Sequence, residues 1–165
     1  MNSTDNLLAK LLELKASWLP PPSVREVSDT EITLEARFPK GILEFYQFSN
    51  GVKENTQELD WHFYSLEHMI NRTTAYRKQH SIILYEGEVL PYRDFVCFCD
   101  VLIELNIYVF CGNPESVNFG KFYGIQEDIH DNKSYGWLVA NTYEEFIQVF
   151  LRQNGEPILE MQEII

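Results

Sequence analysis

This sequence has few cysteines, few basic residues and no long apolar run, and each shortage excludes a class of protein. The three cysteines are an odd number, and two of them lie in an apparent strand, so no disulfide framework is indicated. No segment approaches the roughly 18 consecutive apolar residues that a membrane-spanning helix requires. Residues 1–5 lack the basic region and apolar core of a secretory signal, so we expect a soluble cytoplasmic protein.

Sequence signatures of catalysis and cofactor binding are also missing. There is no nucleophile elbow, no phosphate-binding glycine loop and no dinucleotide fingerprint. The chain has four histidines, which are His62, His68, His80 and His130. They follow no spacing typical of metal ligands, so we expect surface or structural roles for them. We therefore predict no catalytic residue and no cofactor.

The cysteines alone make an incomplete metal site. Cys97 and Cys99 share one face of a predicted strand, and a zinc site would also need Cys111 and a histidine. Thiols that act as small buried hydrophobic groups explain the same residues more simply. We predict no disulfide and no bound metal.

The sequence does contain enough apolar material for a folded core. Of its 165 residues, 45% are hydrophobic and 14% are aromatic, and the aromatic residues are spread along the chain. This composition favours one packed domain over a disordered adaptor.

Acidic residues dominate the charge and are unevenly distributed along the chain, whose formal net charge is −12. Residues 1–53 hold 7 acids and 6 bases, a net charge of −1, whereas residues 54–165 hold 18 acids and 7 bases, a net charge of −11. Such a field repels nucleic acid and attracts a basic partner. Ordinary solubility would explain the same acidity.

Residues 28–51 are the most informative stretch, and their pattern predicts two short helices that meet at a proline. Ser28 and Glu31 have the spacing of a capping box, which would begin the first helix. Pro39 disfavours helix at the residue before it and suits the first turn of the next helix. Gly51 can take the left-handed conformation beyond the second helix. The apolar faces would comprise Ile32, Leu34, Ala36 and Phe38 in the first helix, and Ile42, Phe45, Tyr46 and Ser49 in the second.

The rest of the pattern is β-rich between further helices. A helix is expected over residues 5–17, before a stiff connector at residues 20–22. Ser65 is placed to cap a helix that runs to about Lys78, and Thr142 with Glu145 forms a second capping box for a closing helix. Predicted strands cover residues 60–64, 82–85, 93–99, 101–111 and 137–140, with one or two more between 117 and 125 and acidic loops at 86–88 and 127–133. This order predicts an α+β fold.

Several of these motifs together resemble the SUKH superfamily, also called the Smi/Knr family. The resemblance rests on Phe38-Pro39, Phe45-Tyr46, Asn50-Gly51, Tyr64-Ser65-Leu66-Glu67 and Thr142-Tyr143-Glu144-Glu145-Phe146. It implies a mixed, mainly antiparallel sheet flanked by helices in a single domain over residues 23–153. Residues 1–22 would then be an N-terminal helix with a proline-rich connector, and residues 154–165 a C-terminal tail.

The resemblance also implies a function. Many members look like immunity proteins that neutralise a cognate secreted polymorphic or contact-dependent toxin by direct binding, and others are regulatory scaffolds. We expect a non-enzymatic immunity protein whose partner is a toxin such as a basic nuclease, with no direct nucleic-acid or membrane partner. The alternative is a scaffold that binds an endogenous partner. A hydrolase that uses paired carboxylates, at Glu86 and Glu88 or at Glu127 and Asp128, is a third hypothesis.

The acidic loops and their neighbouring tyrosines are the candidate binding surface. Carboxylates can occupy a groove that normally holds phosphates, and tyrosine often anchors interfaces. The same loops could be merely solvated. The candidate partner-binding residues are Glu54, Glu58, Asp60, Tyr85, Glu86, Glu88, Tyr92, Asp94, Tyr123, Glu127, Asp128 and Asp131.

Overall fold

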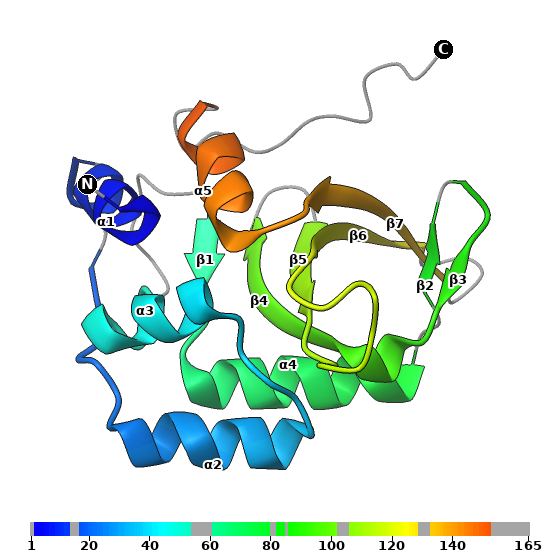
Figure 1. The fold of residues 1–165 in the computed structure, drawn as a ribbon, viewed down its shortest axis with the longest axis horizontal. Helices are drawn as coiled ribbons and strands as arrows, with labels where there is room; N and C mark the ends of the chain where they lie inside the picture. Colours follow the sequence, from blue (N-terminus) through cyan, green and yellow to red (C-terminus); the bar gives the residue numbers. More distant parts are fainter. Residues whose placement is uncertain are drawn as a thin grey trace.

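Helices and one large sheet make up the computed structural model, which describes residues 2–13, 17–53, 61–79, 82–84, 86–101, 106–128 and 133–152. Within these residues there are five α-helices, one short 3-10 helix and seven strands (Figure 1). In chain order they are α1 (Ser3–Glu13), α2 (Val24–Leu34), α3 (Lys40–Phe48), β1 (Trp61–Phe63), α4 (Leu66–Gln79), β2 (Ile82–Leu84), β3 (Val89–Leu90), η1 (Tyr92–Asp94), β4 (Phe95–Val101), β5 (Asn106–Cys111), β6 (Phe122–Asp128), β7 (Lys133–Ala140) and α5 (Tyr143–Arg152). None of the described helices is long and apolar enough to cross a membrane.

The seven strands form one mixed sheet in the order β1-β4-β5-β6-β7-β2-β3. Neighbouring strands are antiparallel except β2 and β7, which are parallel. The predicted α+β fold with a mixed, mainly antiparallel sheet is therefore confirmed. The short strands β1 and β3 form the two edges of the sheet.

Helices cover the sheet on both sides. In Figure 1, α5 lies above the sheet with α1 at its side, whereas α4 lies below the sheet and packs against β4, with α2 beneath α4. Aromatic rings fill the layer under α5, where Phe122 and Phe146 stack with centroids 4.7 Å apart and Trp61 stacks on Tyr108 at 4.8 Å. Strands β4 and β5 are buried along nearly their whole length because both of their faces are covered.

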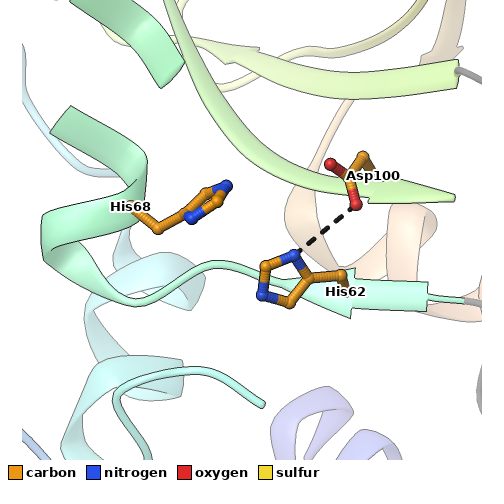
Figure 2. A group of neighbouring side chains, drawn as sticks. All are labelled: His62, His68 and Asp100. Carbon is orange, nitrogen blue, oxygen red and sulfur yellow. Dashed lines mark ion pairs between the residues drawn. The ribbon is translucent and has the colours of Figure 1, made fainter. Parts of the chain in front are cut away.

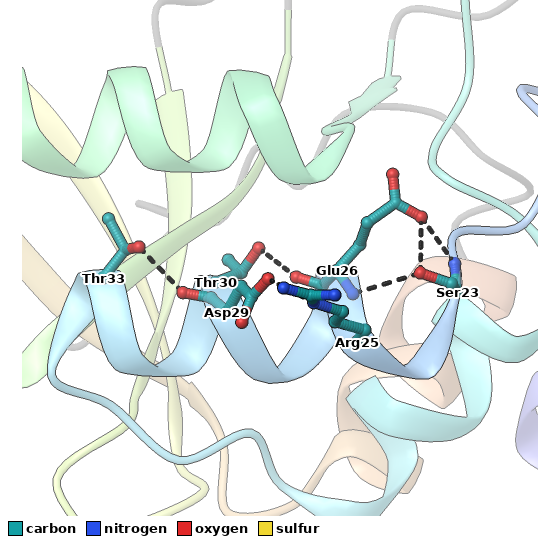
Figure 3. Close-up of polar contacts among 6 residues, drawn as sticks. All are labelled: Ser23, Arg25, Glu26, Asp29, Thr30 and Thr33. Atoms are coloured by element: carbon teal, nitrogen blue, oxygen red, sulfur yellow. Dashed lines mark hydrogen bonds and ion pairs between the residues drawn. The ribbon is translucent and has the colours of Figure 1, made fainter.

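The first helix of the predicted pair begins five residues earlier than expected. Ser23, and not Ser28, caps α2: its hydroxyl accepts the Glu26 N–H at 3.2 Å, and the Glu26 carboxylate accepts the Ser23 N–H at 2.7 Å (Figure 3). The sequence contains two Ser-x-x-Glu spacings, and only the first is used. Glu31 instead accepts the backbone N–H of Phe38 at 2.7 Å.

That contact belongs to a non-helical joint that ends α2 sooner than predicted. Glu35 takes a left-handed conformation with φ of 50°. Its N–H donates to the carbonyls of Glu31 and Ile32 in the last turn of the helix. The Arg37 N–H donates to the Gly112 carbonyl at 2.7 Å, so residues 36–38 are held to the sheet and do not continue the helix. Ile32, expected on the apolar face, is 72% exposed, whereas Leu34, Ala36 and Phe38 are buried.

The second helix of the pair matches its prediction closely. Pro39 is the N-cap of α3, one position before the first turn, and its carbonyl accepts the first helical hydrogen bond. The expected apolar face is buried, and Phe45 is completely so. Gly51 has φ of +85°, as its left-handed role requires.

The N-terminal segment packs into the same core. Leu7 and Leu11 of α1 are fully buried, and α1 lies against α5 and α3. Beyond it, the Leu19 N–H donates to the Gly51 carbonyl at 3.1 Å, and Trp18 bridges to Val52. Residues 17–19 are thereby fastened beside the end of α3.

Other predicted boundaries need correction. The expected acidic loop at 127–133 is shorter, because β6 continues to Asp128 and β7 begins at Lys133. Residues 117–120 form turns, and the strand predicted there begins only at Phe122. Thr142 caps α5 as predicted, but the Glu145 carboxylate accepts the N–H of Asn141, one residue before the cap. The predicted stop of this helix and the C-terminal tail lie outside the described residues.

Candidate functional site

Glu86 and Glu88 are exposed at the turn that joins β2 to β3. Two backbone hydrogen bonds close this turn, from Leu84 to Glu88 at 2.7 Å and from Gly87 to Leu84 at 2.8 Å. The turn extends from the edge of the sheet farthest from β1 (Figure 1). Tyr92, also exposed, lies beyond β3 and begins η1.

Tyr123 lies beneath this acidic turn and not beside it on the surface. Its ring is buried and meets Phe95 edge-on, with centroids 5.2 Å apart. Burial, together with the charges of Cys111, Glu88 and Glu86, raises the pKa of Tyr123 to about 12. The two glutamates are thus close enough to act on this phenol, but the ring supports the surface from below.

Asp94 is partly buried and engaged in the fold. Its carboxylate accepts a hydrogen bond from the Asn113 side-chain amide at 3.0 Å, and its backbone carbonyl accepts the Gly112 N–H at 2.8 Å. Arg93 Nε lies 3.9 Å from the same carboxylate. Asp94 therefore fixes the turn after β5 and has little free capacity for a partner.

The remaining predicted binding residues are not characterised by this structure. Glu127 and Asp128 belong to the end of β6, and their side chains lie outside the described part. Five more lie wholly outside the described residues: Glu54, Glu58, Asp60, Tyr85 and Asp131. The structure thus brings Glu86 and Glu88 near Tyr123, whereas Tyr92 lies beyond β3, at the other end of the hairpin.

A surface hollow of about 380 Å³ lies at the end of α2. The exposed Ile32 side chain lines it, next to Glu31 of the same helix and Pro114 from the turn after β5. The rest of its lining comprises Ser28, Glu35, Ala36 and Arg37. It contains two exposed apolar side chains, Ile32 and Pro114, among charged groups.

At the opposite edge of the sheet, three side chains of metal-binding type converge. His62 comes from β1, His68 from the first turn of α4 and Asp100 from β4 (Figure 2). One potential ligand atom from each lies within 4.8 Å of the other two. His62 Nδ1 is 3.6 Å from Asp100 Oδ1, and the two imidazole rings are 4.9 Å apart. His62 is buried, whereas His68 and Asp100 are half-buried, so the group is reachable from solvent.

The Asp100 carboxylate is oriented by its neighbours. The Tyr64 hydroxyl donates a hydrogen bond of 2.7 Å to Oδ2. Among the described residues, Oδ1 is buried and accepts no hydrogen bond. Burial opposes ionisation of this carboxyl, but the His62 and Tyr64 side chains and the positive charge of Arg72 outweigh it and hold its pKa below the usual range. Asp100 is therefore an anion near neutral pH.

The backbone positions the three side chains through strand register and a helix cap. In the β1–β4 ladder, His62 is directly opposite Asp100. The Ser65 hydroxyl accepts the His68 N–H at 3.1 Å, which confirms Ser65 as the cap of α4 and fixes the turn that carries His68. The Tyr46 hydroxyl donates to the Tyr64 carbonyl at 2.8 Å, so α3 holds the corner between β1 and α4.

Sequence reasoning missed this cluster because it searched for spacing along the chain. His62 and His68 are six residues apart, one on a strand and the other on the helix that follows it. This spacing is not typical of metal ligands. Asp100 joins them only through the pairing of β1 with β4. A histidine in a strand that leads directly into a second histidine near a helix start was the one available signal.

The three cysteines all lie in described strands, are buried and form no disulfide. Burial raises the pKa of the Cys99 and Cys111 thiols. Neutral thiols in β4 and β5 act as small core side chains, in keeping with the sequence interpretation.

No protein-family model matches this chain, and comparison with curated proteins likewise gives no match.

Proposed function

We propose that this protein is a non-enzymatic immunity protein that binds and neutralises a cognate secreted polymorphic or contact-dependent toxin in the cytoplasm. The observation that carries the proposal is the exposed acidic turn of Glu86 and Glu88. It belongs to the part of the chain, residues 54–165, that carries a net charge of −11.

Charge and shape both favour a protein partner at this turn. A closed hairpin presents its carboxylates from a fixed backbone, so little backbone freedom is lost on binding. Acidic side chains attract a basic surface from a distance and raise the association rate. Tyr92, exposed beyond β3 at the other end of the same hairpin, supplies the kind of amphipathic ring that interfaces use as an anchor.

The SUKH resemblance supports the proposal through the roles of its motif residues. Phe45 is in the core, Pro39 begins a helix and Gly51 is left-handed, so these three residues of the motif have structural roles. None of these residues contributes a reactive side chain to the surface. Recognition would therefore depend on loops and edges outside the motif.

A regulatory scaffold is the second candidate, and the hollow beside α2 favours it. Exposed Ile32 offers an apolar contact there, flanked by charged side chains. An endogenous partner that inserts an apolar side chain would use this surface and leave the acidic turn free.

A neutralisation assay distinguishes the two candidates. If the neighbouring gene encodes a large modular protein with a variable C-terminal domain, that domain is expressed alone and together with this chain. The immunity proposal predicts that the domain is toxic and that co-expression restores growth. Continued toxicity with a folded, expressed chain would contradict it.

Charge-reversed variants then test the surface. Glu86→Lys with Glu88→Lys should weaken protection. Glu13→Lys with Glu115→Lys is the matched control, since these two exposed acids lie elsewhere and the net charge changes equally. Equal protection by both variants would exclude the acidic turn as the interface.

A further inference from the structure

We infer that His62, His68 and Asp100 form a binding site for a divalent transition-metal ion of the zinc class. The inference is independent of the proposed immunity function, and it departs from the sequence-based expectation that no metal is bound. It rests on three potential ligand atoms within 4.8 Å of one another, supplied by two imidazoles and one carboxylate.

The donor set fits a divalent metal ion of intermediate hardness, such as Zn²⁺. Zinc binds histidine nitrogen and carboxylate oxygen, and a site with three protein ligands leaves a fourth position for water. Calcium and magnesium prefer oxygen ligands, so two imidazoles disfavour them. The half-buried His68 and Asp100 side chains leave a path by which an ion can enter.

The ligands need only a small movement to reach bonding distance. Ligand atoms about 2.0–2.1 Å from a tetrahedral zinc lie about 3.3 Å from one another. His62 Nδ1 and Asp100 Oδ1, at 3.6 Å, are already close to this separation. Because all three atoms lie within 4.8 Å of one another, the widest separation has to close by at most about 1.5 Å. His68 projects from the first turn of a helix toward the other two side chains, and rotation of its side chain supplies this movement (Figure 2).

A hydrogen bond also orients one of the proposed ligands, as is usual for metal-binding side chains. The Tyr64 hydroxyl holds Asp100 Oδ2, which leaves Oδ1 directed at His62 and buried without a hydrogen bond among the described residues. A cation bound here would take over the contact that His62 Nδ1 now makes with Oδ1 at 3.6 Å and would be held by the same carboxylate. Tyr64 is a positioning residue in this arrangement. The positive charge of Arg72 also attracts the Asp100 carboxylate, so it would compete with the metal ion for this group.

A bound ion would join three separate elements at the edge of the sheet. Strand β1 has only three residues, and the ion would connect it both to its neighbour β4 and to the start of α4. Because the metal binds the folded arrangement and not the unfolded chain, it should raise the melting temperature, and above the dissociation constant the rise should grow with the logarithm of the metal concentration.

The test uses the full-length protein, freed of metal with a chelator and titrated with Zn²⁺. We expect one equivalent to bind and the melting temperature to rise. Co²⁺ is the spectroscopic probe, and its visible bands should indicate four or five nitrogen and oxygen ligands. An intense thiolate charge-transfer band would place the ion on the cysteines and overturn the inference.

Variants identify the ligands. His68→Ala and Asp100→Asn should each weaken Zn²⁺ binding by about 100-fold or more, and Tyr64→Phe by about 10-fold to 100-fold. Glu67→Gln is the control, because it removes an exposed acid from the same turn of α4 as His68. Folding of each variant is checked by circular dichroism in chelator.

The inference is overturned if zinc fails to bind the folded wild-type protein at micromolar concentration. It is equally overturned if His68→Ala and Asp100→Asn, both folded, bind Zn²⁺ as tightly as Glu67→Gln. Loss of binding in the two ligand variants alone, with the melting-temperature shift lost in the same two, supports it.

Discussion

The side-chain carbonyl of Asn50 accepts the backbone N–H of Leu66 at 2.8 Å and so ties the end of α3 to the start of α4. The next residue, Gly51, approaches the same corner, and the Val52 N–H donates to the Phe63 carbonyl at 2.9 Å. The Asn-Gly motif therefore does more than end a helix. It fixes the corner between β1 and α4, which carries both His62 and His68.

Gly51→Ala should destabilise the protein by about 1–3 kcal/mol, because φ of +85° strains any residue with a side chain. A Cβ atom there would also lie 2.6 Å from the Phe63 carbonyl oxygen, so a further cost is expected. Gly87→Ala is the matched control, with φ of +89° but no atom within 4 Å of its Cβ. Urea denaturation should show a larger loss for Gly51→Ala, and equal losses would contradict the packed corner.

Phe45→Ala should lower the free energy of unfolding by about 3–5 kcal/mol, the usual cost of truncating a buried aromatic side chain. Phe45 is completely buried and meets Tyr46 and Phe98 edge-on, with centroids 5.1 and 5.4 Å away. Phe48 of the same helix is 51% exposed, so Phe48→Ala controls for helix propensity and should cost much less. Similar denaturation midpoints for the two variants would place Phe45 outside the core.

Stability should fall in alkali above about pH 10, where tyrosines of the unfolded chain ionise. Burial raises the pKa of Tyr46 and Tyr143 in the folded protein, and that of Tyr123 to about 12. The folded state therefore retains protons that the unfolded state has lost, so the free energy of unfolding decreases as pH rises through this window. Urea denaturation between about pH 8 and 12 measures the slope. Tyr123→Phe should make it shallower, and a wild-type stability that stays constant to pH 12 would contradict the prediction.

The three cysteines should react with a thiol reagent only when the protein unfolds. All are buried, and the raised pKa of the Cys99 and Cys111 thiols keeps them protonated. Reagent added to the native protein should label slowly, and the same reagent in denaturant should label all three rapidly. A cysteine that reacts at once in the native state would show that β4 or β5 is accessible.

The amphipathic helices were predictable from sequence because their burial follows helical periodicity. Met69, Thr73 and Tyr76 of α4 are all buried, as are Tyr143, Phe146, Ile147 and Phe150 of α5. The N-cap of α2 was harder to predict, since Ser23-x-x-Glu26 and Ser28-x-x-Glu31 both have the spacing of a capping box. The choice between them depends on a tertiary contact, in which Glu31 holds the Phe38 N–H.

The candidate sites also differ in whether local sequence or long-range contacts determine them. The acidic turn at 86–88 was predictable, because Gly87 between two acids after an apolar run is a strong local signal. The burial of Tyr123 depends on Phe95 of another strand, and the meeting of His62 with Asp100 depends on the β1–β4 register. Sheet register is a long-range property that no single segment encodes.

The association rate with the toxin domain, measured at low and high salt, tests the immunity proposal most directly. The proposal predicts that Glu86→Lys with Glu88→Lys slows association by about tenfold at low salt and reduces its salt dependence. The control pair, Glu13→Lys with Glu115→Lys, should associate at nearly the wild-type rate, because these exposed acids lie away from the turn. An unchanged rate for the Glu86 and Glu88 variant, or no binding of the toxin domain by the wild-type chain, would contradict the account.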